Sequence, residues 1–186
     1  FLAEEKDFLN YFDKLSKLID EPFGDSSLLP SFMVFDKIKK FTNVAIGGDG
    51  GDENFFGYIT FDAYYFSLIL KKFIPKIVFD IISKITNFFP YSNKYLPLGY
   101  KINKFFSHMN FDNKYLNAFW LSPITLVELE DYFKEKVGID EIFPEIDELF
   151  SKNLPYMRLC QLYYFKFYLP MVLSKIDKAS MFNSIE

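Results

Sequence analysis

Seven consecutive residues, Gly47 to Glu53, hold four glycines and three acids. Glycine is needed where the backbone takes a positive φ or approaches a ligand closely. Asp49, Asp52 and Glu53 concentrate negative charge on this segment, which we call the glycine-acid loop. Carboxylates in such a loop suit Mg²⁺, a hard cation that prefers oxygen ligands and is often shared with phosphates. The loop is therefore the first candidate for a functional site.

Three interpretations of the glycine-acid loop compete on its local pattern. The first is a glycine-rich turn whose acids are merely solvated. The second is a calcium-binding repeat, because residues 47–52 fit half of the nonapeptide G-G-x-G-x-D-x-U-x; such repeats work in tandem stacks, and the sequence has no second copy. The third is a loop that binds nucleotide phosphates and a metal ion. The rest of the chain has to decide between them.

Two lysines near the end of the sequence could take part in phosphate chemistry. Lys175 and Lys178 lie three residues apart in a helical pattern. A lysine can neutralise charge that grows on a departing phosphate while a carboxylate such as Asp52 holds Mg²⁺. Lysines at this spacing are also common on a solvated helix face. The pattern alone leaves both roles open.

Charge and composition exclude several other classes of protein. The net charge of −4 argues against a nucleic-acid-binding protein, because such proteins normally carry an excess of basic residues. The single cysteine, Cys160, excludes an internal disulfide framework, fits a reducing cytoplasm and is interpreted as a small buried residue. The single histidine, His108, is expected on the surface or satisfied in the core. No uncharged run approaches the ~18 residues of a membrane helix.

The sequence predicts that one strand and several helices position the loop. Apolar spacing predicts a helix over residues 3–19 and a second helix with Ser26 or Ser27 as its N-cap. Residues 44–46 are apolar and bounded by glycine, and they predict one buried strand. Helix, strand, loop and helix would form the edge of an α/β sheet, where ligands bind at the carboxyl ends of strands.

Beyond Tyr58 the sequence predicts helices. Pro75 is expected to divide two of them, over residues 63–70 and 73–89, and Ser122 is expected to cap a helix that begins at Pro123. The aromatic-rich stretch 155–168 is predicted to be a buried helix. A further helix is expected from Leu169, and it carries both lysines. Residues 66–155 carry no recognisable chemistry.

Three stretches resemble, in the right order, asparagine synthetases of the glutamine-hydrolysing type. Residues 44–58, VAIGGDGGDENFFGY, are similar to the family's VALSGDGGDELFGGY. Residues 20–27, DEPFGDSS, are similar to DEPFGDPS. Residues 169–186 contain LP, KIDKASM and SIE, which are similar to LP, KVDRASM and SLE. One glycine motif would be weak support, but three ordered matches favour the loop that binds phosphate and metal.

The resemblance implies an α/β synthetase domain of the adenine-nucleotide α-hydrolase type, predominantly helical after one sheet-edge strand and the glycine-acid loop. We expect the chain to be a fragment of that domain: residues 1–65 belong to the nucleotide-binding core, 66–155 form a helical packing region, and 156–186 return as a helix to the active site. The family's SGGxDS ATP loop, its glutaminase half and its RxPFLD stretch are not in the chain. The chain alone is therefore not expected to turn over ATP.

The resemblance also implies a reaction. In this family ATP, with Mg²⁺, adenylates the side-chain carboxylate of aspartate and releases pyrophosphate; ammonia from a glutaminase domain then displaces AMP to give asparagine. The expected setting is a cytoplasmic enzyme with small-molecule substrates, a glutaminase domain upstream and a homodimeric assembly. One alternative is a related amidotransferase that acts on another carboxylate, as on a surface-polysaccharide sugar or in amide-ring closure. The other is a non-catalytic calcium-binding or scaffold module.

The same resemblance implies a role for each site residue. Asp52 would be a ligand of Mg²⁺, Asp49 the base that takes a proton from the attacking ammonia, and Lys178 the cation that stabilises charge during adenylation. The residues expected to bind substrate and nucleotide are Gly47, Gly48, Gly50, Gly51 and Glu53.

Three positions in the glycine-acid region depart from the family pattern. Gly47 stands where the family has serine, Phe56 where it has glycine, and Asn54 where it has an apolar residue. These departures bear on the identity of the substrate more than on the use of a nucleotide.

Overall fold

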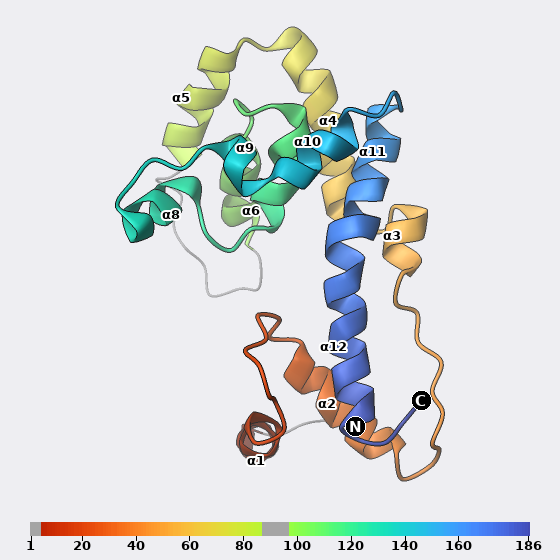
Figure 1. Ribbon diagram of the computed structural model, residues 1–186. Helices are drawn as coiled ribbons and strands as arrows, with labels where there is room; N and C mark the ends of the chain where they lie inside the picture. The colour runs from red at the N-terminus through yellow and green to blue at the C-terminus, as the bar shows by residue number, and fades with distance from the viewer. Residues whose placement is uncertain (1–4, 87–96) are drawn as a thin grey trace. The chain divides into compact units, whose positions relative to one another are not determined.

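The structure, a computed structural model, describes residues 5–86 and 97–186, and over these residues the chain is predominantly helical (Figure 1). It divides into two compact units. Unit 1 comprises Phe1–Asp52 and Phe165–Glu186, and unit 2 comprises Glu53–Tyr164. The expected roles of residues 1–65, 66–155 and 156–186 stay a prediction.

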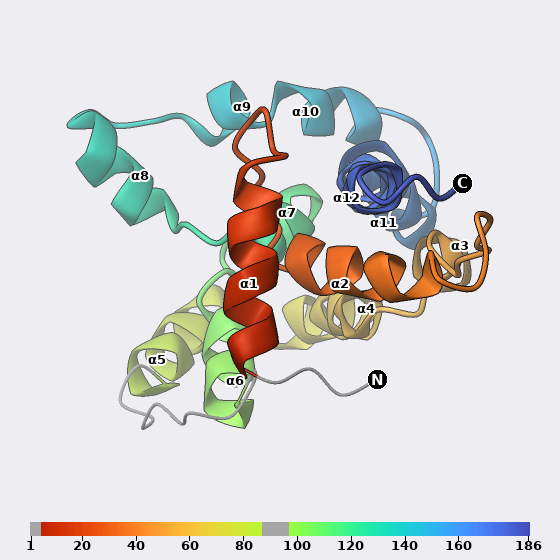
Figure 2. The same cartoon turned by 90° about the horizontal axis from the view of Figure 1, so that it is seen from below.

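Unit 1 is built from α1 (Glu5–Ser16), α2 (Leu28–Ile38) and α12 (Leu169–Met181). The short helix α3 (Gly51–Phe55) and the π-helical turn η2 (Tyr164–Tyr168) stand at the boundaries of the unit. Helix α2 packs against both α1 and α12, as Figure 2 shows. The predicted helices before the loop and after Leu169 are thus confirmed, except that residues 3 and 4 of the first lie outside the described residues.

The core of unit 1 forms where these three helices meet. Its buried residues are Leu15, Leu28, Leu29, Phe32, Met33 and Ala179. Phe32 is fully buried, and its ring makes edge-on contacts with Tyr11 of α1, at 6.1 Å between centroids, and with Phe182, at 6.4 Å. This one side chain therefore links the beginning of the chain to its end.

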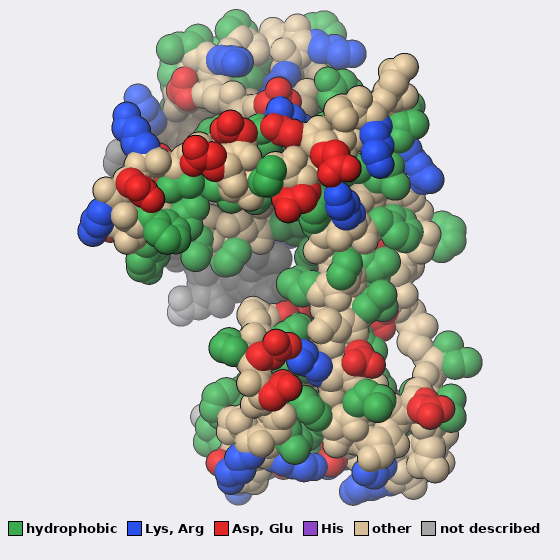
Figure 3. All heavy atoms as spheres, viewed as in Figure 1, with side chains coloured by type: hydrophobic (Ala, Val, Ile, Leu, Met, Phe, Trp, Pro, Cys, Tyr) green, Lys and Arg blue, Asp and Glu red, His purple; other side chains and the backbone are tan. Residues whose placement is uncertain are grey.

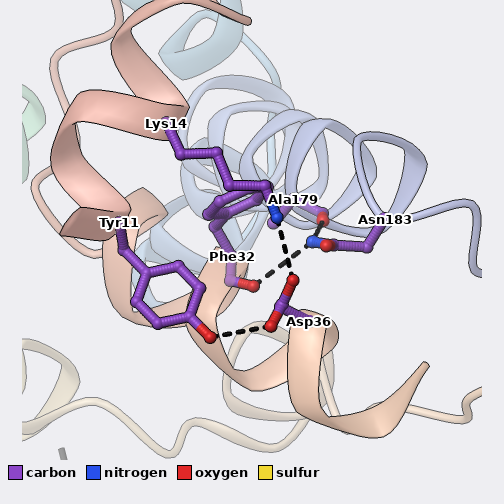
Figure 4. A network of polar contacts seen from close by, with 6 residues as sticks. All are labelled: Tyr11, Lys14, Phe32, Asp36, Ala179 and Asn183. Carbon is purple, nitrogen blue, oxygen red and sulfur yellow. Dashed lines mark hydrogen bonds and ion pairs between the residues drawn. The ribbon is translucent and has the colours of Figure 1, made fainter. Parts of the chain in front are cut away.

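A polar network reinforces that junction (Figure 4). Asp36 accepts hydrogen bonds from the Tyr11 hydroxyl at 2.7 Å and from the Lys14 ammonium at 2.9 Å. Burial alone would raise the pKa of Asp36, but these hydrogen bonds outweigh it and lower that pKa. On the other side of α2, the buried Asn183 amide donates to the carbonyl oxygens of Phe32 and Ala179. The backbone at the end of α12 is thereby fixed to α2.

The start of α2 differs in detail from the prediction. Ser27 occupies the N-cap position, as expected, but its side chain caps no backbone N–H of the helix. Both its amide and its hydroxyl donate to Asp25 Oδ1, at 2.8 and 2.6 Å. Asp25 therefore closes an Asx turn immediately before the helix.

The strand predicted over residues 44–46 is wrong. The described residues contain no strand, and Val44 and Ile46 are 59% and 99% exposed. A strand requires a neighbour that satisfies its backbone groups. Here the backbone is bonded to single residues instead: the Ala45 N–H donates to the Glu186 oxygen at 2.7 Å, the Glu186 N–H donates to the Asn43 oxygen at 2.9 Å, and the Val44 N–H donates to the Thr42 hydroxyl. The α/β sheet that the resemblance implies is not seen in residues 5–86 and 97–186.

Unit 2 is a helical assembly. Its elements are α4 (Ile59–Phe73), α5 (Lys76–Thr86), α6 (Leu98–Phe106), the 3₁₀ turn η1 (Asn113–Tyr115), α7 (Leu116–Leu121), α8 (Leu126–Phe133), α9 (Ile139–Ile142), α10 (Pro144–Phe150) and α11 (Tyr156–Tyr163). Pro75 separates α4 from α5, as predicted; residues 87–89 of the second predicted helix lie outside the described residues.

The cap predicted for the helix after α7 is wrong. Ser122 ends α7, and its hydroxyl donates to the Ile124 oxygen. The next helix, α8, begins at Leu126 with Thr125 as its N-cap, and Glu128 closes a capping box with it. Thr125 and Glu128 have the T-x-x-E spacing of that motif, so the sequence already contained the true helix start.

Aromatic side chains fill the core of unit 2. Phe61 and Tyr164 are fully buried with ring centroids 4.6 Å apart. The indole of Trp120 stacks on Phe105 at 5.5 Å and an interplanar angle of 18°. Cys160 is also fully buried, and burial raises the pKa of its thiol to about 12, so its interpretation as an unreactive core residue is confirmed.

His108 is a satisfied core residue of unit 2. It is 7% exposed and stacks on Phe119 at 5.2 Å. Its Nδ1 lies 3.1 Å from the carbonyl oxygen of Lys104 and therefore donates the hydrogen bond. Burial lowers the pKa of His108, and the nearby Lys104 ammonium also lowers it.

The lowered pKa of His108 predicts a loss of stability in acid. Below pH 6.5 the unfolded chain binds a proton that the folded chain resists, so the free energy of unfolding should fall with pH until the folded pKa is reached. The slope cannot exceed about 1.4 kcal/mol per pH unit for one proton. Urea unfolding of the wild-type chain between about pH 7.5 and 5 should show a free energy of unfolding that falls with pH. In His108→Phe this dependence on pH should be weaker. An unchanged slope in the variant would assign the acid sensitivity to other groups.

Candidate functional site

The glycine-acid loop leads from an extended segment into α3. Gly50 takes φ = 88°, a left-handed conformation that glycine adopts without steric cost. A Cβ at Gly48 or Gly51 would meet nothing within 4 Å, whereas one at Gly47 would lie 2.9 Å from Asp49 Oδ2. Glycine at position 47 thus leaves room for the Asp49 carboxylate, and the space beside Gly48 and Gly51 is open.

Two of the three loop acids face solvent. Asp49 and Asp52 are exposed, and Asp52 stands in the first turn of α3. No cluster of three His, Cys, Asp or Glu side chains that could enclose a metal ion occurs in the described ranges. Mg²⁺ usually takes only one or two protein carboxylates and completes its shell with water and substrate phosphates. The single exposed carboxylate of Asp52 fits that mode of binding and does not fit an all-protein cage.

Glu53 differs from the other loop acids because it is buried in unit 2. It is 1% exposed, and the Tyr58 hydroxyl donates to its Oε1 at 2.8 Å. Gln161 of α11 donates to the carbonyl oxygen of Asn54 at 2.8 Å and also reaches that of Glu53. These contacts fix the backbone of α3. Glu53 thus takes a structural position, and its expected role in binding substrate stays a prediction.

Lys178 lies on α12 and makes ion pairs with the acidic segment 20–27. Its Nζ lies 2.8 Å from Glu21 Oε1 and 3.8 Å from Asp20 Oδ1. The hydrogen bond to Glu21 is the main cause that raises the pKa of Lys178. One helical turn earlier, Lys175 pairs with Asp25 at 3.6 Å between Nζ and Oδ2. Both lysines therefore face the same segment.

The three motif segments meet within unit 1. Ion pairs of Lys175 and Lys178 join residues 20–27 to α12. The backbone of Glu186 is hydrogen-bonded to Asn43 and Ala45, directly before the glycine-acid loop. Segments at the start, middle and end of the chain are thus connected by described contacts. None of the described ion pairs links Lys178 to Asp49 or Asp52.

Comparison with known proteins identifies the family. The family model described as asparagine synthase matches residues 1–186. A putative glutamine-hydrolysing asparagine synthetase 2 of Methanocaldococcus jannaschii is 36% identical over 149 residues, which cover 78% of this chain and 25% of that protein. The chain belongs to the asparagine synthase family. The aligned part spans a quarter of that relative's length, and no solved structure matches the chain.

Membership of the asparagine synthase family explains one strained residue. Phe56 has φ = 59°, and Phe56 occupies a position where the family motif has glycine. A left-handed residue with a side chain costs of order 1–2 kcal/mol. The ring makes an edge-on contact with the buried Phe61 at 4.9 Å, which offsets part of this cost. Phe56 thus holds a left-handed conformation that glycine would adopt without steric cost.

Four features of this chain could not be located by sequence pattern. Three of them are side chains whose roles depend on burial or on contacts with residues distant in the chain: Gln161, Tyr58 and Glu21. The residue type alone does not reveal such contacts. The left-handed Phe56 was visible only as a departure from the motif.

A cavity of about 570 Å³ lies elsewhere, between α4, α6 and α7 of unit 2. Its lining is mostly apolar, with Phe66, Phe105 and Trp120 among its walls, and no predicted site residue borders it. Asp62, Lys101 and Lys104 also border the cavity, and the expectation that residues 66–155 carry no chemistry stays a prediction. In the ranges 5–86 and 97–186, no helix combines the length and the apolar character that a bilayer crossing demands.

Proposed function

We propose that the full-length protein uses ATP to form an amide bond. Its product would be asparagine, made from aspartate and from ammonia derived from glutamine. The observation that carries this proposal is the meeting of the three family motifs in unit 1 through the pairs Lys178–Glu21 and Ala45–Glu186. Membership of the asparagine synthase family supports ATP-dependent amide formation in general. The proposal extends to a cytoplasmic, homodimeric enzyme with a glutaminase domain.

The proposed reaction has two steps. An oxygen of the aspartate side-chain carboxylate attacks the α-phosphorus of ATP, pyrophosphate leaves, and aspartyl-AMP forms. Ammonia then attacks the acyl carbon, and AMP leaves with the electron pair of the broken C–O bond. The nitrogen loses one proton, and the product is the neutral side-chain amide of asparagine.

The chain's own residues supply the charges that these steps need. Asp49 is exposed on the glycine-acid loop and is proposed to accept the proton from nitrogen. Lys178 is proposed to stabilise the negative charge that develops on the phosphates. Asp52 would hold Mg²⁺, which offsets the charge of pyrophosphate as it departs. Open space beside Gly48 and Gly51 lets a nucleotide approach the backbone closely.

The proposal is tested by measuring pyrophosphate release from the full-length protein with ATP and Mg²⁺, with and without aspartate. We expect release that depends on aspartate and yields asparagine when glutamine or ammonia is present. Release only with another carboxylic acid would keep the adenylation chemistry and assign the protein to a related amidotransferase. No release with any acceptor acid would refute the proposal.

The isolated chain of residues 1–186 is the matched negative control, since it lacks the SGGxDS loop of the family. We expect no aspartate-dependent release from it. Turnover by this chain alone would show that the nucleotide site needs only unit 1 and unit 2.

A further inference from the structure

The two lysines of α12 pair with carboxylates that differ in exposure to solvent. Asp25, the partner of Lys175, is 20% exposed in its side chain and is held by the Ser27 amide and hydroxyl. Glu21, the partner of Lys178, is 65% exposed. The Lys175 pair is therefore locked in place, whereas the carboxylate of Glu21 is free to move into solvent.

Lys178 itself is held more firmly than its partner. Its side chain is 18% exposed, so most of its stem is covered while its ammonium meets Glu21 and Asp20 at the surface. An ion pair with a mostly exposed carboxylate contributes little net free energy, because water and salt screen it. A pyrophosphate, which carries more negative charge than one carboxylate, can replace such a partner at small cost.

The charges around Lys178 make this exchange necessary. Glu21 and Asp20 both make ion pairs with its ammonium, and the Asp177 carboxylate of the same helix adds to the negative charge that acts on it. An anion that approaches Lys178 without displacing Glu21 meets net negative charge. Figure 3 shows that acidic and basic side chains both occur on the face in view.

We infer that Glu21 is the resting counter-ion of Lys178 and that a phosphate group of the nucleotide or of pyrophosphate takes its place. This inference rests on the proposed function and adds Glu21 as a positioning residue that acts through Lys178. While no anion is bound, Glu21 keeps the Lys178 ammonium next to the segment 20–27. When the anion arrives, Glu21 swings into solvent, and the lysine keeps its position.

The test uses Glu21→Gln in the full-length protein, with inorganic pyrophosphate and Mg²⁺ as the probe in titration calorimetry. Glutamine keeps an oxygen acceptor at the same reach, so Lys178 stays positioned, but the competing charge is gone. We expect pyrophosphate to bind up to about fivefold more tightly, the limit set by an exposed ion pair. Unchanged or weaker binding would overturn the inference, because removal of a competing counter-ion has to leave Lys178 more available to the anion.

Two variants control for general effects. Asp13→Asn removes one negative charge from an exposed pair with Lys17 in the same unit, and Asp25→Asn removes the locked partner of Lys175. Neither should tighten binding of pyrophosphate. If both tighten it as much as Glu21→Gln does, the effect is one of overall charge and the inference fails.

Lys178→Met separates this inference from the proposed function. We expect it to weaken pyrophosphate binding. Combined with Glu21→Gln, it should also abolish the gain in affinity that Glu21→Gln gives on its own. Full binding by Lys178→Met would overturn the exchange, even if aspartate-dependent pyrophosphate release stands. Conversely, a protein that releases no pyrophosphate but shows the exchange would lose the proposed function and keep an anion site at Lys178.

Discussion

Asp52→Asn is expected to lower aspartate-dependent pyrophosphate release by the full-length protein about 10²- to 10³-fold, the loss typical of removing one preorganised group that stabilises transition-state charge. Asp52 is exposed in the first turn of α3 and is the residue proposed to hold Mg²⁺. Asparagine has the same shape but lacks the charge that attracts a divalent cation. The variant should also need more Mg²⁺ for half-maximal activity, which a titration with MgCl₂ measures.

The matched control for Asp52→Asn is Asp62→Asn, on the first turn of α4. Both variants should unfold within about 0.5 kcal/mol of the wild type, because exposed polar substitutions seldom change stability by more. Only Asp52→Asn should lose activity. Wild-type activity and Mg²⁺ dependence in Asp52→Asn would remove Asp52 from the proposed metal site.

Phe32→Ala is expected to lower the free energy of unfolding of unit 1 by about 3–5 kcal/mol, as for other large buried aromatic residues. Phe32 is fully buried, and its ring contacts Tyr11 and Phe182, so truncation leaves a cavity at the junction of α1, α2 and α12. The Lys14 ammonium, 5.1 Å from the ring centroid, also loses its contact with the ring. Urea unfolding followed by far-ultraviolet circular dichroism measures the change.

Phe41→Ala provides the comparison, since Phe41 is 89% exposed and its truncation removes the same atoms. Its effect should stay within about 0.5 kcal/mol. If Phe32→Ala costs less than about 1 kcal/mol, the junction repacks around the gap and Phe32 is not its central residue. Because this junction holds α12 against α2, Phe32→Ala should also disturb the pairs of Lys175 and Lys178.

The sequence predicted those parts of the fold that depend on local pattern. The apolar spacing of α1, α2 and α12 is strong, and Pro75 breaks a helix by removing a backbone donor, so these elements are where they were expected. The strand at 44–46 failed because strand formation depends on a partner strand, which the local sequence does not contain. The cap of α8 was misplaced because Ser122-Pro123 was preferred to the capping box at Thr125.

In the candidate site, too, the local features could be predicted and the long-range contacts could not. The glycine-acid loop and the lysines of α12 could be found from residue types and from the resemblance. Their contacts could not: Lys178 and Glu21 are 157 residues apart in sequence, and whether a lysine is locked or exchangeable depends on the exposure of its partner. Glu53 looked like the other two loop acids and proved to be buried, because the start of α3 turns it toward Tyr58.

The single tryptophan of the chain, Trp120, stacks on Phe105 inside unit 2. Intrinsic fluorescence of residues 1–186, excited at the red edge of the indole band, therefore reports the environment of unit 2 and is blind to the unit that carries Asp52 and Lys178. Far-ultraviolet circular dichroism reports the helices of both. If the two optical transitions coincide, the units unfold as one cooperative block. If Phe32→Ala separates them, part of the circular dichroism should be lost before the fluorescence changes, because only circular dichroism reports unit 1.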